Sequence, residues 1–86
     1  MSSALGLQDM ADTATLIEDA GFGGLWLTEA GRTAYLSCAA AALATERIRL
    51  GTAVAVAFPR SPMVTAQVAW ELADATDGRF VLGLGT

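Results

Sequence analysis

Residues 48–86 decide the fold, and they read IRLGTAVAVAFPRSPMVTAQVAWELADATDGRFVLGLGT. The run Ile48–Val54 is rich in β-branched and aliphatic side chains, which favours a strand. Apolar residues then recur at four- and three-residue steps, as on one face of a helix, before a second apolar run starts at Arg79 or Phe80. A strand, a helix and a strand in this order are typical of a parallel sheet.

The ends of this helix are marked by residues with known positional preferences. Ser61 suits the N-cap, because its side-chain oxygen can accept a backbone N–H of the first turn. Pro62 suits the first helical turn, where its missing N–H leaves no bond unmade. Asp77-Gly78 then closes the helix and releases the next strand. The sequence therefore predicts a helix that starts at Ser61 or Pro62.

The same alternation extends toward the N-terminus. Apolar residues at three- and four-residue spacings predict a helix over Gly6–Ala20, with Gly21 as its stop, and a strand follows at Leu25–Thr28. The stretch Tyr35–Ala44 is dense in alanine and contains no glycine or proline, so a second helix is expected there. The predicted order is αβαβαβ with three parallel strands.

The connections between the strands bear on the architecture. If the strands are added in one direction, both crossover helices lie on the same face, because parallel crossovers are right-handed in about 98% of cases. The runs Leu25–Leu27 and Phe80–Leu82 are nevertheless apolar at consecutive positions, so both of their faces need cover. A closed (β/α)8 barrel supplies that cover from its other strands. A doubly wound sheet supplies it with helices on both faces, which requires the strand order to reverse.

The composition excludes several classes of function. A chain of 86 residues has room for one small domain, and its 53% hydrophobic content excludes a disordered tail. Five arginines are spread singly among nine acidic residues, without the basic stripe that nucleic-acid binding requires. No apolar run approaches the ~20 residues that span a membrane. Histidine, the commonest zinc ligand, is absent. We expect a cytoplasmic protein without a metal site, in which the single Cys38 packs in a helix.

Three strand tips carry the residues that could do chemistry, because ligands of α/β folds bind at the C-terminal ends of the strands. Glu29 is the sharpest candidate, since it directly follows an apolar strand; the alternative is a solvated loop carboxylate. Gly51-Thr52-Ala53 is the second, because glycine lets a flat ligand approach closely, although Gly51 could equally mark a bulge. Gly83-Leu84-Gly85 resembles half of a phosphate-binding turn. Arg60 fits a loop cation better than a phosphate clamp.

Four segments share a resemblance to a known family. They are GFGGLWLTE at 21–29, ATERIRLGTAV at 44–54, FPRSPMV with AWEL within 58–72, and GRFVLGLGT at 78–86. In this order and spacing they resemble the N-terminal quarter to third of the bacterial luciferase-like monooxygenase family, and most closely its deazaflavin-dependent oxidoreductase branch. Each piece is weak alone, but together they cover nearly all of the chain.

The resemblance implies a (β/α)8 barrel in which this chain supplies strands two to four. Members bind the deazaflavin coenzyme F-420 or, as the alternative here, reduced FMN, and they transfer hydride or activate oxygen on small organic substrates. Gly51, Thr52 and Ala53 match a third-strand bulge that often holds a non-prolyl cis peptide against the cofactor ring. Gly83 and Gly85 match an open fourth-strand tip that leaves space for that ring.

The resemblance also assigns Glu29 as the candidate catalytic residue. It matches an acid at the second strand's tip, where it would make a polar or acid/base contact. Many members place histidine next, and this chain has Ala30, so histidine-assisted versions of the mechanism are excluded. Barrel phosphate sites use the loops after strands seven and eight, which these residues do not include. Residues 1–86 are therefore expected to be a single fragment of a barrel domain that is inactive alone.

Two other hypotheses remain at this point. The chain could be a noncatalytic module that pairs its open strand edges with a second copy or with a partner, as unpaired strands tend to do. It could also be a small doubly wound nucleotide-binding domain, which would carry helices on both faces of its sheet.

Overall fold

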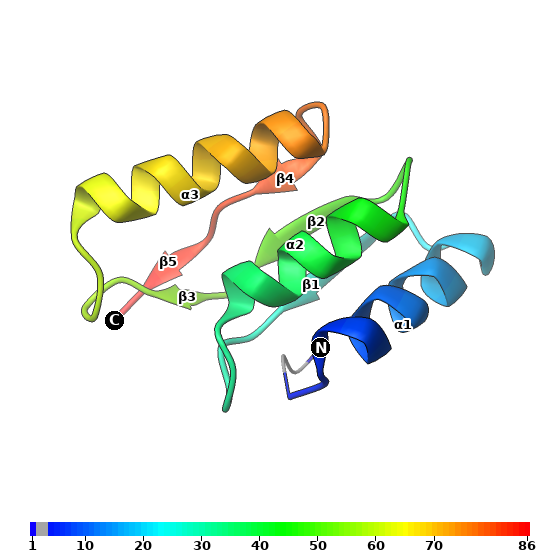
Figure 1. Ribbon diagram of the computed structural model, residues 1–86, viewed down its shortest axis with the longest axis horizontal. Coiled ribbons are helices and arrows are strands. Elements are labelled where there is room, and N and C mark those ends of the chain that lie inside the picture. The colour runs from blue at the N-terminus through cyan, green and yellow to red at the C-terminus, as the bar shows by residue number, and fades with distance from the viewer. Residues whose placement is uncertain (2–3) are drawn as a thin grey trace.

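The computed structural model describes residue 1 and residues 4–86, which form three helices and five short strands (Figure 1). The predicted α/β fold with parallel strands is confirmed, and each predicted helix is present with its ends within two residues of the predicted ones. The helices are α1 (Leu7–Asp19), α2 (Ala34–Ala44) and α3 (Pro62–Ala75). The strands are β1 (Gly24–Leu27), β2 (Arg49–Thr52), β3 (Ala55–Val56), β4 (Phe80–Val81) and β5 (Leu84–Gly85).

The predicted strand Ile48–Val54 is wrong in its extent, because the chain divides there into β2 and β3. The peptide bond between Ala53 and Val54, which lies between the two strands, is cis. The last apolar run divides in the same way into β4 and β5. Where the β2–β4 pairing ends and the β3–β5 pairing begins, the Thr52 side chain makes the hydrogen bonds to the neighbouring chain segment. It donates to the Gly83 carbonyl at 2.8 Å and accepts from the Gly83 N–H at 3.0 Å.

The strands form two small parallel sheets, one ordered β1-β2-β4 and the other pairing β3 with β5. Successive residues of a strand face opposite sides of its sheet, so adjacent rows of side chains point in opposite directions. One row of the larger sheet contains Leu25, Leu50 and Phe80, and the next contains Trp26, Gly51 and Val81. The first row faces the helices, and the second faces away from them.

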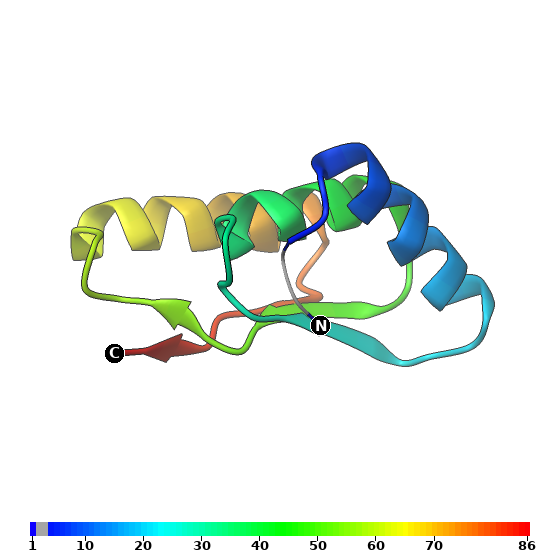
Figure 2. The same cartoon turned by 90° about the horizontal axis from the view of Figure 1, so that it is seen from below.

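All three helices lie on one face of the strands (Figure 2). Buried side chains fill the space between the two layers, among them Met10, Leu27, Cys38 and Leu50. The opposite face is open, and Trp26 and Val81 are 38% and 39% exposed on it. This arrangement is that of a section of a barrel wall. The doubly wound alternative is wrong, because it requires helices on both faces.

Both ends of α3 follow the predicted local chemistry. The Ser61 hydroxyl accepts the backbone N–H of Val64 at 3.2 Å and so caps α3, with Pro62 in the first turn. After α3 the chain turns through Asp77 and Gly78, which have φ values of 52° and 84°. Glycine adopts this left-handed region at no steric cost, so the Asp77-Gly78 pair permits the tight reversal into β4.

Two charged side chains fasten the helices to the N-terminal ends of the strands. The Glu18 carboxylate accepts the backbone N–H groups of Glu46, Arg47 and Ile48 at 2.7–3.2 Å. The bond from the Arg47 N–H is the main reason that the pKa of Glu18 is lowered. Arg79 donates to the Ile48 carbonyl at 2.8 Å from the turn that precedes β4. These bonds satisfy backbone groups that no helix or strand partner reaches.

Cys38 lies in the core, as its alanine-rich surroundings predict. Its side chain is fully buried, and the thiol donates to the Gly51 carbonyl at 3.6 Å. Burial raises the pKa of this thiol to about 12, because an apolar environment disfavours the thiolate. Cys38 is therefore an inert packing residue at neutral pH.

Candidate functional site

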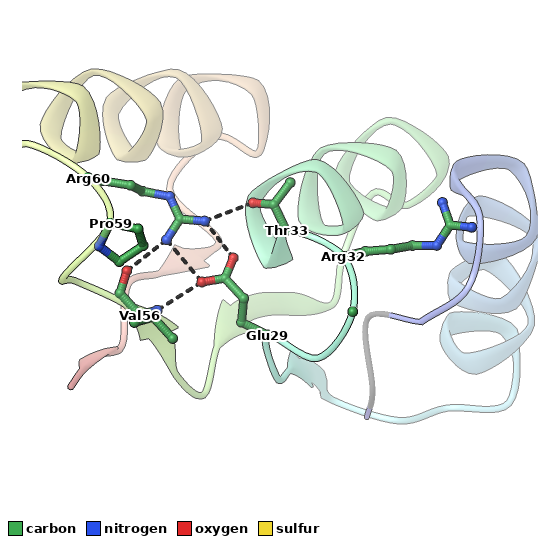
Figure 3. A pocket seen from close by; sticks show the side chains of 7 residues that line it. Glu29, Arg32, Thr33, Val56, Pro59 and Arg60 are labelled. Carbon is green, nitrogen blue, oxygen red and sulfur yellow. Dashed lines mark hydrogen bonds and ion pairs between the residues drawn. The ribbon is translucent and has the colours of Figure 1, made fainter.

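The candidate site lies at the C-terminal ends of the strands, where the β1–α2 loop and the β3–α3 loop come together (Figure 3). A hollow of about 480 Å³ opens between them. Glu29 and Arg60 meet there, with Pro59 and Val56 beside Arg60 (Figure 3). The lining residues are Glu29, Gly31, Arg32, Thr33, Val56, Pro59 and Arg60.

Glu29 lies just beyond the tip of β1, directly after Thr28, and forms a two-pronged ion pair with Arg60. Glu29 Oε1 accepts Arg60 Nη1 at 2.9 Å, and Glu29 Oε2 accepts Arg60 Nη2 at 2.6 Å. Each carboxylate oxygen also accepts one backbone N–H, from Val56 on Oε1 and from Ala34 on Oε2, both at 2.9 Å. An ionised carboxylate has about four acceptor positions, so all of them are in use.

These contacts fix the charge state of Glu29. The ion pair with Arg60 is the main cause, and the two backbone N–H groups add to it, so that the pKa of Glu29 falls to about 2. The side chain is only 13% exposed, so bulk water screens the pair weakly. Glu29 is therefore a carboxylate anion across the physiological pH range.

Arg60 is equally well satisfied. Beyond Glu29, its Nη1 donates to the Val56 carbonyl at 2.7 Å and its Nη2 donates to the Thr33 hydroxyl at 3.0 Å. Its guanidinium lies over the Tyr35 ring, with 4.6 Å from the central carbon to the ring centroid, a cation–π geometry. All four N–H groups of the two terminal nitrogens thus have protein partners, which agrees with a loop cation and leaves none of these donors for a phosphate.

The pairing of Glu29 with Arg60 was not predicted from the sequence. One signal could have found it. Glu29 follows one strand, and Arg60 lies in the turn between the neighbouring strand and the next helix, so parallel pairing brings both to the same edge. A single arginine in a turn opposite a single acid at the adjacent tip indicates an ion pair in that geometry.

Thr52 and Gly83 are in direct contact, as the two-way hydroxyl bond shows. A methyl group added to Gly83 would collide with the Thr52 carbonyl oxygen, so only glycine fits there. At Gly51 the added carbon would lie 2.7 Å from the Trp26 indole nitrogen, and at Gly85 it would lie 2.5 Å from a Val54 methyl carbon. Close packing within the protein therefore explains all three glycines.

The backbone of β3 links the two groups of candidate residues. The Ala55 N–H donates to the Gly83 carbonyl at 2.8 Å, and the next N–H, that of Val56, points the other way to Glu29. Ala53 is exposed, and its N–H donates to the Leu27 carbonyl at 2.8 Å. Beside these small residues lie the apolar residues Trp26 and Val54, which are 38% and 43% exposed. The strand tips thus carry small residues and exposed apolar side chains, and the ionised Glu29 follows the tip of β1.

Two kinds of feature are absent from the part of the chain that the structure describes. No group of three or more histidine, cysteine or acidic side chains is placed to hold a metal ion. No helix there combines the length and the apolar character that crossing a bilayer requires.

The luciferase-like monooxygenase family profile matches residues 1–86. An uncharacterized protein of Mycobacterium tuberculosis is 47% identical over 76 residues, which cover 88% of this chain and 22% of that protein. A second protein of this organism, provisionally named a coenzyme F420-dependent oxidoreductase, is 39% identical over 79 residues, covering 91% of this chain and 23% of the relative. The chain thus spans less than a quarter of the length of these relatives.

Solved structures share the fold. The coenzyme F420-dependent tetrahydromethanopterin reductase of Methanopyrus kandleri superposes with a TM-score of 0.88 at 24% identity, over 99% of this chain and 25% of that one. The oxygenating constituent of 3,6-diketocamphane monooxygenase from Pseudomonas putida, solved with FMN, superposes with a TM-score of 0.82 at 22% identity, over 92% of this chain and 24% of that one.

Proposed function

The chain belongs to the luciferase-like monooxygenase family, and from this premise we propose that it supplies one side of the cofactor pocket in a flavin- or deazaflavin-dependent oxidoreductase. The intact enzyme would transfer hydride between the cofactor and a small organic substrate. The observation that supports this most is the edge at Gly51–Ala53 and Gly83, where small residues and apolar side chains lie at the tips of the strands, while the ionised Glu29 follows the tip of β1.

A flat ring system fits this edge. Gly51, Ala53 and Gly83 present little or no side chain at the strand tips, and Trp26 and Val54 offer apolar surface next to them. These residues would hold the ring by contact and exclude water from one side of it. Glu29 would add a polar contact at the rim. When bound, the cofactor supplies the hydride chemistry, and these residues orient it.

Coenzyme F-420 is the cofactor we favour, and FMN is the alternative. The support for F-420 is the relative at 39% identity, whose name assigns it that coenzyme. The support for FMN is weaker, since the monooxygenase that was solved with FMN shares only the fold with this chain.

A titration of the intact gene product tests the proposal. We expect saturable binding of F-420, followed by its fluorescence, and weaker binding of FMN. Ala53 is exposed at the tip, so Ala53→Trp can block the ring site without overpacking the core, and it should abolish binding. Leu43→Ala is the control, because Leu43 is 84% exposed on the outer side of α2. Wild-type protein that binds neither cofactor, oxidised or reduced, would refute the proposal.

Residues 1–86 alone should show no turnover. We treat them as a single fragment of the barrel domain, because they span less than a quarter of the relatives' length. In (β/α)8 barrels the phosphate group is bound by loops after strands seven and eight, so these residues could touch the ring but not grip the phosphate. Turnover by the isolated chain, measured with either reduced cofactor, would contradict this.

A second candidate function is a noncatalytic module that associates through open strand edges. The observation that favours it is the exposure of large apolar side chains on and between the strands, where five of them are 36–49% exposed. They are Trp26, Val54, Val81, Leu82 and Leu84. Light scattering on residues 1–86 decides this: association that grows with concentration supports the module, and a stable monodisperse monomer argues against it.

A further inference from the structure

We propose that Arg60 is a positioning residue. Together with Glu29 it makes the backbone hydrogen bonds to β3 that a neighbouring strand would otherwise make. Glu29 therefore acts as a fixed anion and exchanges no proton during turnover. This inference rests on the proposed function and narrows it, because Glu29 could otherwise serve as either a polar or an acid/base contact.

The pair occupies the free edge of β3. One edge of this strand bonds to β5, since the N–H groups of Ala55 and Ala57 donate to the Gly83 and Gly85 carbonyls, each at 2.8 Å. Val56 lies between them, and its backbone groups point the other way. Its N–H donates to Glu29 and its carbonyl accepts Arg60, which is the pattern that a further strand would supply.

The same pair holds the start of α2. Glu29 accepts the Ala34 N–H, one of the helix N-terminal groups that lack a partner within the helix, and Arg60 donates to the Thr33 hydroxyl. Thr33 makes no capping bond of its own to this helix. One ion pair therefore connects the tip of β1, the start of α2, β3 and the turn before α3. Through β3 it also fixes the position of Gly83 and Gly85.

The bonding leaves no capacity for proton transfer. A proton that arrived on either oxygen of Glu29 would have to displace one of four N–H donors, two of them from a guanidinium. The two side chains are 13% and 18% exposed, so water does not readily replace a lost partner. A general acid or base needs a vacant position toward the reacting group, and Glu29 has none.

The test uses the intact enzyme with the variants Glu29→Gln, Arg60→Gln and the double variant. Each single variant should lower kcat about 10- to 100-fold, because small displacements at a cofactor site have effects of this size. The kcat of the double variant should be no lower than that of the poorer single variant, because both substitutions break the same ion pair. Arg60→Lys should recover part of the loss, since it keeps the charge but not the paired geometry.

Glu18→Gln is a matched control. Glu18 also accepts several backbone N–H groups, but it does so at the opposite, N-terminal end of the strands. This variant should lower thermal stability and leave kcat within about twofold of wild type. If Glu18→Gln lowers kcat as much as Arg60→Gln does, the effect is general destabilisation and the positioning role is refuted.

The pH profile separates positioning from acid/base chemistry. If Glu29 only positions, the shape of kcat against pH is unchanged in Arg60→Gln, and Glu29→Gln keeps it too. If Glu29 transfers a proton, loss of Arg60 moves the acidic limb upward and Glu29→Gln removes it, which overturns the inference. Should the variants misfold, NMR of the Glu29 carboxyl carbon in the wild-type protein reports its protonation directly. A titration of this carboxyl between pH 5 and 8 would overturn the inference that it exchanges no proton. Failure of wild-type protein to bind either cofactor refutes the proposed function instead.

Discussion

The free energy of the Glu29–Arg60 pair should appear as a pH-dependent difference between wild type and Glu29→Gln. The pKa of Glu29 is lowered from 4.5 to about 2 in the folded protein, chiefly by Arg60. A depressed carboxyl pKa contributes stability that is present above the unfolded value and is lost as pH falls toward the folded value. At about 1.4 kcal/mol per pKa unit, the full contribution is at most about 3.5 kcal/mol.

The pH window follows from the same two values. At pH 7 the whole contribution is present, because the carboxyl is ionised in both states. At pH 3 the unfolded carboxyl is protonated while the folded one remains ionised, and about 2 kcal/mol of the contribution has been lost. The difference in unfolding free energy between wild type and Glu29→Gln should therefore shrink by about 2 kcal/mol from pH 7 to pH 3.

Urea denaturation of the intact protein, followed by circular dichroism at several pH values, measures this difference. Taking wild type minus variant cancels the titration of groups that both proteins share. Glu71→Gln is the reference substitution, because Glu71 is exposed on α3, and its difference curve should change less over the same range. A Glu29→Gln difference that stays constant from pH 7 to pH 3, or that grows, would refute the assignment of Glu29 as a buried, paired anion.

Three further predictions concern the strand tips and the core. Thr52→Val keeps the side-chain shape but removes both bonds to Gly83, and it should lower the free energy of unfolding by about 1–3 kcal/mol in urea denaturation. Gly83→Ala places a methyl group against the Thr52 carbonyl, so it should cost about 1–3 kcal/mol and weaken cofactor binding in the same titration; unchanged stability and affinity would contradict the packing. Cys38, buried with a pKa of about 12, should not react with a thiol reagent until urea unfolds the protein, and rapid native labelling would contradict its burial.

Local patterns predicted the elements well because their causes are local. The Ser61 cap, Pro62 in the first turn and the Asp77-Gly78 reversal each act within a few residues, and the structure confirms them. The extent of the strands was harder to predict. The run Ile48–Val54 is rich in β-branched and aliphatic residues on both sides of Thr52, and this composition did not indicate that the strand ends there. That division depends on the Thr52 hydroxyl and Gly83, which are 31 residues apart.

The candidate site shows the same limit. The position of Glu29 after a strand marked it as a candidate, and the small residues at Gly51–Ala53 and Gly83 marked the tips. Sequence position could not show that Glu29 is saturated with hydrogen bonds, because its partners come from α2, β3 and the turn before α3. Arg60 was interpreted as a loop cation, and it lies in the turn before α3. Its pairing with Glu29 became visible only in the structure, where the strand tips lie side by side.

The sequence by itself determined that this is an α/β chain of parallel strands joined by helices, because periodicity and capping are properties of the local chain. The structure was needed to decide that all three helices lie on one face of the strands (Figure 2). Only the tertiary structure decided how the strand tips are joined and which charges meet there. The reason is that hydrogen bonds and ion pairs act over about 3 Å, and the residues that make them, such as Glu29 and Arg60, reach that distance only after the strands have paired.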